Sequence, residues 1–532
     1  MTALPARQAG CYNRGVYEAN PLPPQLPWWM RLPIDRVGLI LGPVVMIAWL
    51  LQPRPESLTP EAHRFAGVFM LTVIWWVTEP IPIAATGLLS VVLSALVGVF
   101  PADWPTDRIA KTLFAPFASP SVFFLIGSLF IGCAMMRHGL DRRIAIGILS
   151  TRWAGRSPST ILLGVGVATM LVSMWVSNVA ATAMIYPVTL GIIDVLALSA
   201  GGPEFRRSKY ASALLLMTGY ASTVGGISTP IGTSTNIVAR GFFQQQAYFG
   251  KSVDFGRWCL VGIPLMIVIM LGLFAWLRLG ARLKEFDLTR LRDFLQAERA
   301  KLGPWNRGEV NTLITFLLVV GLWIAPSLLG GLGWPAEREW LERHLPEEIV
   351  SILAPILLFL LPINYRERKF TLEPGDFSKI DWGTMLLFGA GLSLGNLMVE
   401  TRLAEAIGHE AFIRLGTKDV WIVTAAALLV AIAFSEFSSN SATASTLIPV
   451  VNAICQASDI DALAPLMGVA LGASFGSALP VSTPPNAVIY GSGLLPVRRM
   501  IVAGLGLDLL AGLTIFATLR IALGLGWSPF AP

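Results

Sequence analysis

Residues 435–450 read SEFSSNSATASTLIPV, and they directly follow the apolar run LLVAIAF. The stretch carries seven hydroxyl side chains, one Asn and one Glu in an otherwise hydrophobic neighbourhood. Burying polar groups without partners is costly, so such a cluster is not tolerated inside an ordinary apolar helix. The stretch therefore predicts an interrupted helix whose break faces a polar space.

The rest of the chain explains the hydrophobic surroundings. Of the 532 residues, 54% are hydrophobic and 14% are charged, and the mean hydropathy is +0.65. Apolar runs such as 81–100 and 258–277 are long enough to cross a hydrocarbon layer roughly 30 Å thick. We therefore expect an all-α polytopic membrane protein rather than a soluble protein with buried helices.

Other compositional signals exclude some classes of protein. The four Cys residues are scattered and indicate neither a disulfide framework nor a metal site. The first twenty residues lack the apolar core of a signal peptide. The net charge is +6, but basic residues in a membrane protein mark its cytoplasmic side, so nucleic acid is not an expected partner.

We expect about 11 transmembrane helices. They lie near 37–53, 63–79, 81–100, 118–137, 210–245, 255–281, 309–330, 347–363, 381–400, 463–492 and 499–525. Two further apolar segments, 158–195 and 420–455, are each interrupted in the middle by Ser-Asn. Each is either two full spans or a re-entrant hairpin. We favour re-entrant hairpins, because a turn at the midplane accounts for polar tips and a turn in water does not.

Basic residues then set the orientation. With 11 spans, two hairpins and a cytoplasmic N-terminus, 26 of the 39 Lys and Arg residues fall in cytoplasmic segments. We expect a multi-pass protein of the cell inner (plasma) membrane. The expected units are a cytoplasmic N-terminal tail, a first half, a cytoplasmic connector and a second half, at 1–36, 37–281, 282–308 and 309–532. The first half holds the hairpin 158–195 and a broken span at 210–245, and the second holds the hairpin 420–455 and a broken span at 463–492.

The two halves resemble each other at their interruptions. SMWVSNVAATAMIYPV at 173–188 aligns with SEFSSNSATASTLIPV at 435–450 through the Ser-Asn of each. GGISTPIGTSTNIV and SALPVSTPPNAVIYG align through Asn236 and Asn486. The two hairpins are expected to open to opposite sides of the membrane. Interrupted segments at matching positions of two inverted halves are the best sequence indication of a midplane binding site in a transporter.

These residue types suit ions. A broken helix presents N–H groups that attract anions and carbonyl groups that suit a hard cation such as sodium. Hydroxyls and amides add neutral donors and acceptors. No Lys or Arg lies in the four motifs, so an anion there would depend on co-bound cations. The alternative is that small residues only pack helices closely; the amides of Asn178 and Asn440 argue against it, because a buried amide needs partners.

SEFSSNSATA and LPVSTPPNAVIYGSG resemble motifs of the divalent anion/sodium symporter family, the INDY-type transporters of dicarboxylates, citrate and sulfate. The resemblance extends from about residue 37 to residue 525. It implies a scaffold domain, a transport domain that moves in elevator fashion, and a homodimer in the lipid bilayer.

The resemblance also implies which residues hold the cargo. The first sodium site would contain Ser173, Ser177, Asn178 and Gly232. The second sodium site would contain Ser435, Ser438, Asn440 and Ser482. The anion would contact Ser177, Asn178, Val179, Thr233, Ser439, Asn440, Ser441, Thr483 and Pro484. Na+ is the expected coupling ion, and no organic cofactor is expected.

One position departs from the family pattern. Val179 stands where the family has Thr, whereas Ser441 keeps the hydroxyl at the matching position of the second half. Losing one such donor changes affinity by on the order of 1 kcal/mol. Val179 therefore bears on which anion binds rather than on where it binds.

The main expectation is a sodium-coupled symporter of divalent anions, above all C4-dicarboxylates such as succinate. The alternatives are a sodium-independent dicarboxylate exchanger on the same fold and a sulfate or citrate symporter. An exchanger would favour a basic side chain in place of a sodium ion, and the motifs contain none. The spans show no nucleophile–base pair, HExxH motif or carboxylate pair, so an enzyme is not expected. Glu436 is expected to accept hydrogen bonds from a broken helix rather than to relay a proton.

Overall fold

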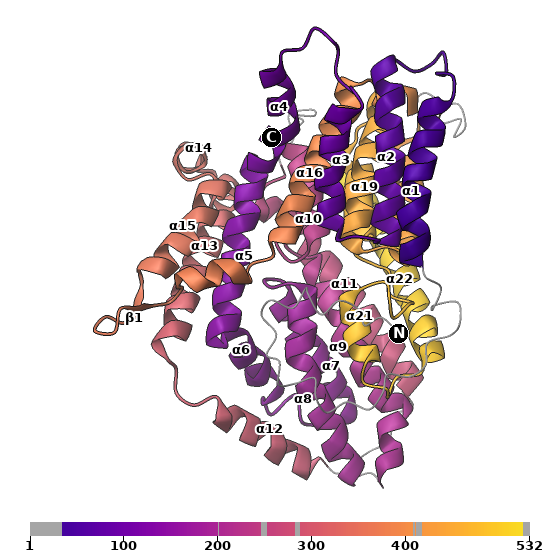
Figure 1. The fold of residues 1–532 in the computed structure, drawn as a ribbon. Helices are drawn as coiled ribbons and strands as arrows, with labels where there is room; N and C mark the ends of the chain where they lie inside the picture. The colour runs from indigo at the N-terminus through magenta and orange to yellow at the C-terminus, as the bar shows by residue number, and fades with distance from the viewer. Residues whose placement is uncertain are drawn as a thin grey trace.

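The computed structural model describes residues 34–199, 202–245, 253–281, 288–407, 410 and 418–524. It is built almost entirely of helices (Figure 1). The helices of the first half are α1 (Ile34–Leu51), α2 (Pro60–Thr78), α3 (Ile83–Leu96), α4 (Thr106–Phe114), α5 (Pro120–His138), α6 (Leu140–Leu149), α7 (Pro158–Ser173), α8 (Asn178–Ser199), α9 (Lys209–Gly226), α10 (Ser234–Gln245) and α11 (Phe255–Ala281). The expected N-terminal tail lies almost wholly outside the described residues.

A short helix then leads into the second half. This is α12 (Thr289–Lys301), within the expected connector. The later helices are α13 (Arg307–Gly331), α14 (Pro335–His344), α15 (Glu347–Leu360), α16 (Trp382–Glu400), α18 (Val420–Ser435), α19 (Asn440–Ser458), α20 (Leu463–Gly472), α21 (Pro484–Tyr490) and α22 (Val497–Gly524). We call α7–α8 hairpin 1 and α18–α19 hairpin 2. Break 1 is the segment 227–233 between α9 and α10, and break 2 is the segment 473–483 between α20 and α21.

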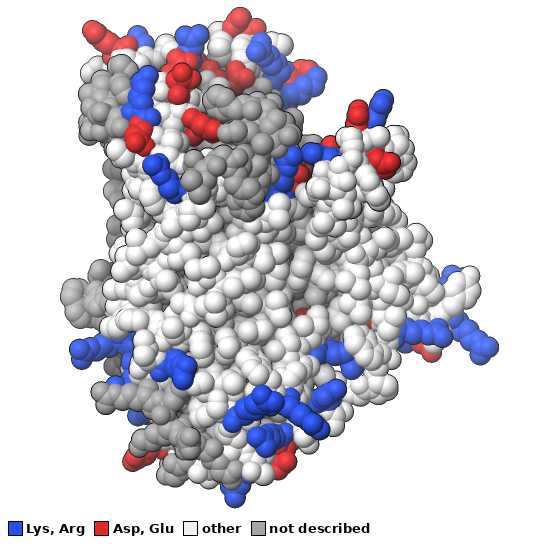
Figure 2. Space-filling model, turned by 180° about the vertical axis from the view of Figure 1, so that it is seen from behind, with Lys and Arg blue, Asp and Glu red and all other residues white. Residues whose placement is uncertain are grey.

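The surface has the charge distribution of a membrane protein. Figure 2 shows a broad uncharged band, with Lys, Arg, Asp and Glu gathered at the two ends of the molecule. Among the described residues, seven helical segments are long and apolar enough to cross a membrane, and four shorter apolar helices accompany them. The protein is therefore a multi-pass helical membrane protein.

Local sequence signals place the helix ends next to the hairpins. α5 ends at Gly139, which adopts the left-handed backbone conformation at φ 75° that glycine tolerates best. α7 begins with Pro158 in its first turn, behind a capping box formed by Ser157 and Thr160. Inside both hairpins the helix stops at a Ser and restarts at an Asn five residues later, at Ser173–Asn178 and at Ser435–Asn440.

The two halves exchange their short helices. α7 packs on α9 and α18 packs on α20, each hairpin against the broken helix that follows it in the chain. α10, by contrast, packs on α19 and α20, and α21 packs on α8 and α9. The second part of each broken helix thus lies against the other half. This exchange brings both breaks and both hairpin turns into one region.

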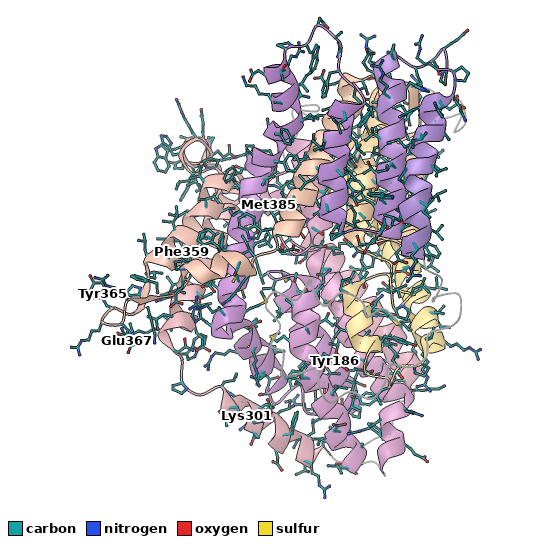
Figure 3. All side chains as sticks on the ribbon, viewed as in Figure 1. Tyr186, Lys301, Phe359, Tyr365, Glu367 and Met385 are labelled. Carbon is teal, nitrogen blue, oxygen red and sulfur yellow. The ribbon has the colours of Figure 1, made fainter. Side chains whose placement is uncertain are left out.

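Two apolar cores support that region. The larger includes buried side chains of α7, α8, α9, α11, α20 and α22, and the smaller packs α2 and α3 against α16. A small two-stranded sheet, β1 (Pro362–Asn364) and β2 (Lys369–Phe370), follows α15, and Asn311 of α13 donates a hydrogen bond to the carbonyl of Pro362. Its outer turn carries Tyr365 and Glu367, which project away from the body in Figure 3. Two 3-10 helices, η3 (Ala115–Ala118) and η6 (Pro374–Lys379), precede α5 and α16.

Candidate functional site

The turn of hairpin 1 is held by its own polar side chains. The hydroxyl of Ser173, which is fully buried, donates a hydrogen bond to Oδ1 of Asn178 at 2.9 Å. The backbone N–H of Ala180 donates to Oγ of Ser177 at 3.3 Å, so Ser177 caps the start of α8. This turn thus brings together three residues expected in the first sodium site, Ser173, Ser177 and Asn178.

Hairpin 2 repeats this arrangement. The hydroxyl of Ser435 donates to Oδ1 of Asn440 at 2.8 Å, and Ser439 accepts a hydrogen bond from the N–H of Ala442 at 3.3 Å. The amide nitrogen of Asn440 also donates to the carbonyl oxygen of Ser474, in break 2, at 3.1 Å. The side chain of Asn440 therefore joins the hairpin turn to the broken helix.

Each break is closed by one Asn side chain. Nδ2 of Asn236 donates to the carbonyl oxygens of Gly226 and Thr229, at 3.0 and 2.8 Å. Nδ2 of Asn486 donates to those of Gly476 and Leu479, at 3.3 and 3.1 Å. In both breaks the acceptors lie ten and seven residues before the Asn. These bonds satisfy carbonyl groups that an interrupted helix leaves without partners.

Two glycines let the backbone approach closely at break 1. A Cβ on Gly226 would lie 2.3 Å from Oδ1 of Asn178, and a Cβ on Gly232 would lie 2.4 Å from the carbonyl oxygen of Gly226. A side chain at either position would clash with the oxygen atom that the glycine faces. Gly232, also expected in the first sodium site, is thus adjacent to the carbonyl of Gly226, and Asn178 faces the same glycine.

The remaining expected residues of the second half occupy break 2 and its borders. The hydroxyl of Ser482 donates to the carbonyl oxygens of Gly476 and Leu479, the latter at 2.8 Å. Thr483 caps α21 by accepting from the N–H of Asn486 at 3.4 Å. The hydroxyl of Ser438 instead donates to the carbonyl of Trp76 in α2, at 3.4 Å. The structure thus places Ser438 against α2, away from the hydrogen bonds of break 2.

Several of the expected anion contacts are accessible. Ser177 and Pro484 are exposed, and Val179, Ser439, Asn440 and Ser441 are half-buried, whereas Thr233 and Thr483 are buried. Among the described residues, no group of His, Cys, Asp and Glu is arranged to hold a metal ion. A cation at these turns would therefore be held by hydroxyl, amide and carbonyl oxygens, the ligands that suit a hard cation.

Two residues that the sequence did not single out join the halves. The hydroxyl oxygens of Ser234 and Ser441 share a hydrogen bond at 2.5 Å, and those of Thr235 and Ser474 share one at 2.8 Å. Ser234 and Thr235 begin α10 and directly precede Asn236 in the stretch GTSTN. Their position next to Asn236 is the sequence feature that could have indicated Ser234 and Thr235. The contact of these two residues with the second half could not be predicted from the sequence, because it depends on the exchange of short helices between the halves.

Glu436 accepts hydrogen bonds from a broken helix, as expected, and it has an acidic neighbour, Asp508, that the sequence did not indicate. Its two carboxylate oxygens accept from the N–H groups of Ala478 and Leu479 at 3.0 and 3.3 Å. Asp508 of α22 accepts from the neighbouring N–H of Ser477 at 3.2 Å, so the two carboxyl groups bind consecutive N–H groups of break 2. We expected no carboxylate pair within the spans from the sequence, and this was wrong. The two acids are far apart in the chain, and only the packing of α22 against hairpin 2 brings them together.

These features define a class of protein. Two interrupted helices and two helical hairpins, contributed equally by both halves of a multi-pass membrane protein, build a single polar centre, and this is the construction of a secondary transporter. Residues 35–528 match the family model described as the sodium:sulfate symporter transmembrane region. The chain belongs to this family, the divalent anion/sodium symporters.

Individual relatives agree with that assignment. The sodium-dependent dicarboxylate transporter SdcS of Staphylococcus saprophyticus is 32% identical over 489 residues, which cover 89% of each chain. The transporter of the same name from Staphylococcus aureus is 31% identical over 500 residues, or 92% of each chain. Among solved structures, the YdaH transporter of Alcanivorax borkumensis matches with a TM-score of 0.54 at 16% identity, covering 87% of this chain and 100% of the other. This last likeness concerns the fold alone.

Proposed function

We propose that the protein is a sodium-coupled symporter of divalent anions, and that C4-dicarboxylates such as succinate are its substrates. The observation that carries the proposal is the pair of matching Ser–Asn turns, each beside a break closed by a second Asn. Two relatives that align over most of this chain are named sodium-dependent dicarboxylate transporters, which supports both the cation and the anion.

Each turn offers one place for a sodium ion. In the first, oxygens of Ser173, Ser177 and Asn178 combine with the backbone at Gly232. In the second, Ser435, Ser438 and Asn440 combine with Ser482. Both sets supply neutral oxygen ligands at the ends of interrupted helices, where carbonyl groups favour a cation. The contact of Ser438 with Trp76 favours Ser435, Asn440 and Ser482 as the principal ligands of the second set.

The anion would lie between the two turns. One carboxylate would contact Ser177, Asn178 and Thr233, and the other would contact Ser439, Asn440, Ser441, Thr483 and Pro484. The hydroxyls and amides donate hydrogen bonds, and the N-terminal ends of α8 and α19 provide favourable dipoles. None of these side chains is cationic, so the two sodium ions would supply the positive charge that the dianion requires. Val179 offers no hydroxyl, which weakens the first half of this cradle.

Transport would follow an elevator type of alternating access. The hairpins, both broken helices, α11 and α22 would form a transport domain. The other long helices would form a scaffold and the interface of a homodimer. We place the protein in the cell inner membrane with its N-terminus in the cytoplasm, because this orientation puts most Lys and Arg residues inside.

The test is succinate uptake into proteoliposomes, with and without an inward sodium gradient and with no substrate inside. Sodium-dependent uptake is the expected result. Asn178→Ala and Asn440→Ala should each raise the sodium concentration for half-maximal uptake by about tenfold, since each removes hydrogen bonds worth roughly 1–3 kcal/mol. Asn452→Ala is the matched control, because Asn452 is a buried Asn of the same α19 but lies away from the turn.

Other outcomes assign other functions. Uptake that ignores sodium and appears only after dicarboxylate is loaded inside would identify an exchanger. Uptake of sulfate or citrate in place of succinate would keep sodium coupling and change the substrate. Sodium-independent uptake at full affinity, at constant membrane potential, would refute the coupling mechanism.

A further inference from the structure

A pocket of about 370 Å³ lies outside the polar centre, between α6 and α12. One wall is the end of α6 and the turn that leads to α7, and the other wall is α12, at the bottom of Figure 1. The lining residues are Leu149, Ser150, Thr151, Arg152, Gly155, Arg156, Arg292, Leu295 and Gln296. No motif of the transport centre falls within it, so the pocket is a separate feature.

The lining is positively charged. It contains three arginines and no acidic residue, together with the polar side chains of Ser150, Thr151 and Gln296. Among the described residues, no carboxylate forms an ion pair with Arg152, Arg156 or Arg292. Glu298, the buried acid of α12, is already paired with Arg142 and Lys301. Within the described residues, the positive charge of this lining is therefore not offset by a carboxylate.

Arginine selects the chemistry of that ligand. Its planar group forms paired hydrogen bonds with phosphate oxygens, and several arginines around one concave surface suit a multiply charged group. A volume of this size lies within the range of small-ligand pockets. Arg292 is also held in place, since its Nε donates to the carbonyl of Gly155 at 3.3 Å across the pocket.

The setting is that of a membrane surface. Trp153, in the same turn, is 40% exposed, and Trp residues at the end of a membrane protein commonly lie at headgroup depth. Figure 2 shows Lys and Arg gathered at this lower end, below the uncharged band. Basic pockets on such a face bind the headgroups of anionic lipids.

One wall of the pocket, α12, also packs against hairpin 1. α12 contacts α8 through Phe294, whose ring lies 2.4 Å from the position that a Cβ on Gly191 would take. Leu291 and Leu295 of α12 are buried beside it. Figure 3 labels Lys301 at the end of α12 and Tyr186 on α8. A ligand that joined α12 to the turn before α7 would therefore hold together both ends of hairpin 1.

We propose that this pocket binds the phosphate group of an anionic ligand, with an anionic phospholipid of the surrounding membrane as its source, and that the bound phosphate fixes α12 against the turn that opens hairpin 1. A soluble phosphate compound has the same chemistry and is the other source that the experiment distinguishes.

The test uses the purified full chain in neutral detergent and follows thermal unfolding and lipid retention by native mass spectrometry. Phosphatidylglycerol is compared with phosphatidylcholine, and inorganic pyrophosphate is the soluble probe. The variants are R152Q/R292Q and R152Q/R156Q, the second of which preserves the Arg292–Gly155 bond. R290Q/R299Q is the control, because it removes two arginines of α12 that do not line the pocket.

Phosphatidylglycerol should stabilise the wild type and the control. In both pocket variants its binding should weaken about thirtyfold, as expected for the loss of two basic contacts. Protection by pyrophosphate alone, lost in the same two variants, would support the site and assign it to a soluble anion. Equal protection of all four proteins by phosphatidylglycerol, or no protection of the wild type by either probe, would overturn the proposal.

Discussion

The hydroxyl oxygens of Ser234 and Ser441 lie 2.5 Å apart, although 207 positions separate the two residues in the chain. Ser234 begins the second part of the first broken helix, and Ser441 lies in the first turn of α19 in hairpin 2. Thr235 and Ser474 form a second such link beside it. The two halves therefore share hydrogen bonds at the centre itself. A change in one half should be measurable in the other.

Ser234→Ala should weaken dicarboxylate transport. The change leaves Ser441 without its partner, and a hydrogen bond of this kind is worth about 1 kcal/mol, so the KM for succinate should rise about fivefold. Ser441→Ala should raise the KM at least as much, because Ser441 is also a proposed anion contact, and the double variant should be little worse than Ser441→Ala alone, because the double and single changes remove the same bond. Uptake kinetics in proteoliposomes measure all three.

The control for this pair is Thr514→Ala, because the Thr514 hydroxyl donates only within its own helix, to the carbonyl of Leu510. Its KM should match that of the wild type. Fully additive effects of the two serine changes would show that Ser234 and Ser441 act separately, in contradiction to the geometry.

Glu436→Gln should disturb break 2. The carboxylate accepts from two N–H groups, of Ala478 and Leu479, and a Gln side chain offers only one oxygen in its place. One buried N–H then lacks an acceptor, at a cost of roughly 1–3 kcal/mol. We expect a lower unfolding temperature and a higher sodium requirement for uptake. Glu400→Gln, at the exposed end of α16, should change neither, and a normal sodium requirement in Glu436→Gln would separate the carboxylate from the second sodium site.

Much of the fold could be predicted because hydrophobic length and polar interruption are local signals. The Ser-Asn pairs marked the places where α7 gives way to α8 and α18 to α19. The small sheet was not predicted. It depends on a tight turn in which Asn364 accepts from the N–H of Arg366 and Arg368 adopts a positive φ of 51°, and no periodic pattern indicates such a turn.

The candidate site was predictable where a residue acts within its own segment. The capping roles of Ser177, Ser439 and Thr483 follow from short-range spacing. Contacts between segments could not be derived. The Glu436–Asp508 pair and the Ser234–Ser441 bond both require knowledge of which helix lies beside which, and hydropathy carries no such information.

Arg240 of α10 forms a buried connection to α15. Its side chain is 2% exposed, pairs with Glu347 and Glu348, and lies 3.9 Å from the ring centre of Phe124. Arg240→Ala would leave buried carboxylates without their cation, which costs about 3–5 kcal/mol. We expect a strongly lowered unfolding temperature, measured by fluorescence-detected chromatography after heating. Arg240→Met combined with Glu347→Gln should recover much of it, and equal instability of the double variant would refute the pairing.

Asp141 should make the stability of the folded protein depend on pH. It lies in the first turn of α6, outside the spans, and burial raises the pKa of its carboxyl group to about 6, although the N–H of Arg142 donates to it at 2.7 Å. The folded protein thus holds this proton more tightly than the unfolded chain, whose carboxyl has the ordinary pKa near 3.8. The favourable contribution of the neutral form is complete below about pH 4 and is lost as the pH rises through 6, for a total on the order of 3 kcal/mol.

Asp141→Asn is neutral at every pH, so it should raise the unfolding temperature at pH 8 and lose that advantage towards pH 4. Thermal unfolding of the purified protein across this range measures the difference, with Asp107→Asn on the exposed face of α4 as the control. The same gain at pH 4 and pH 8 would mean that the Asp141→Asn change stabilises α6 by a route other than the missing charge.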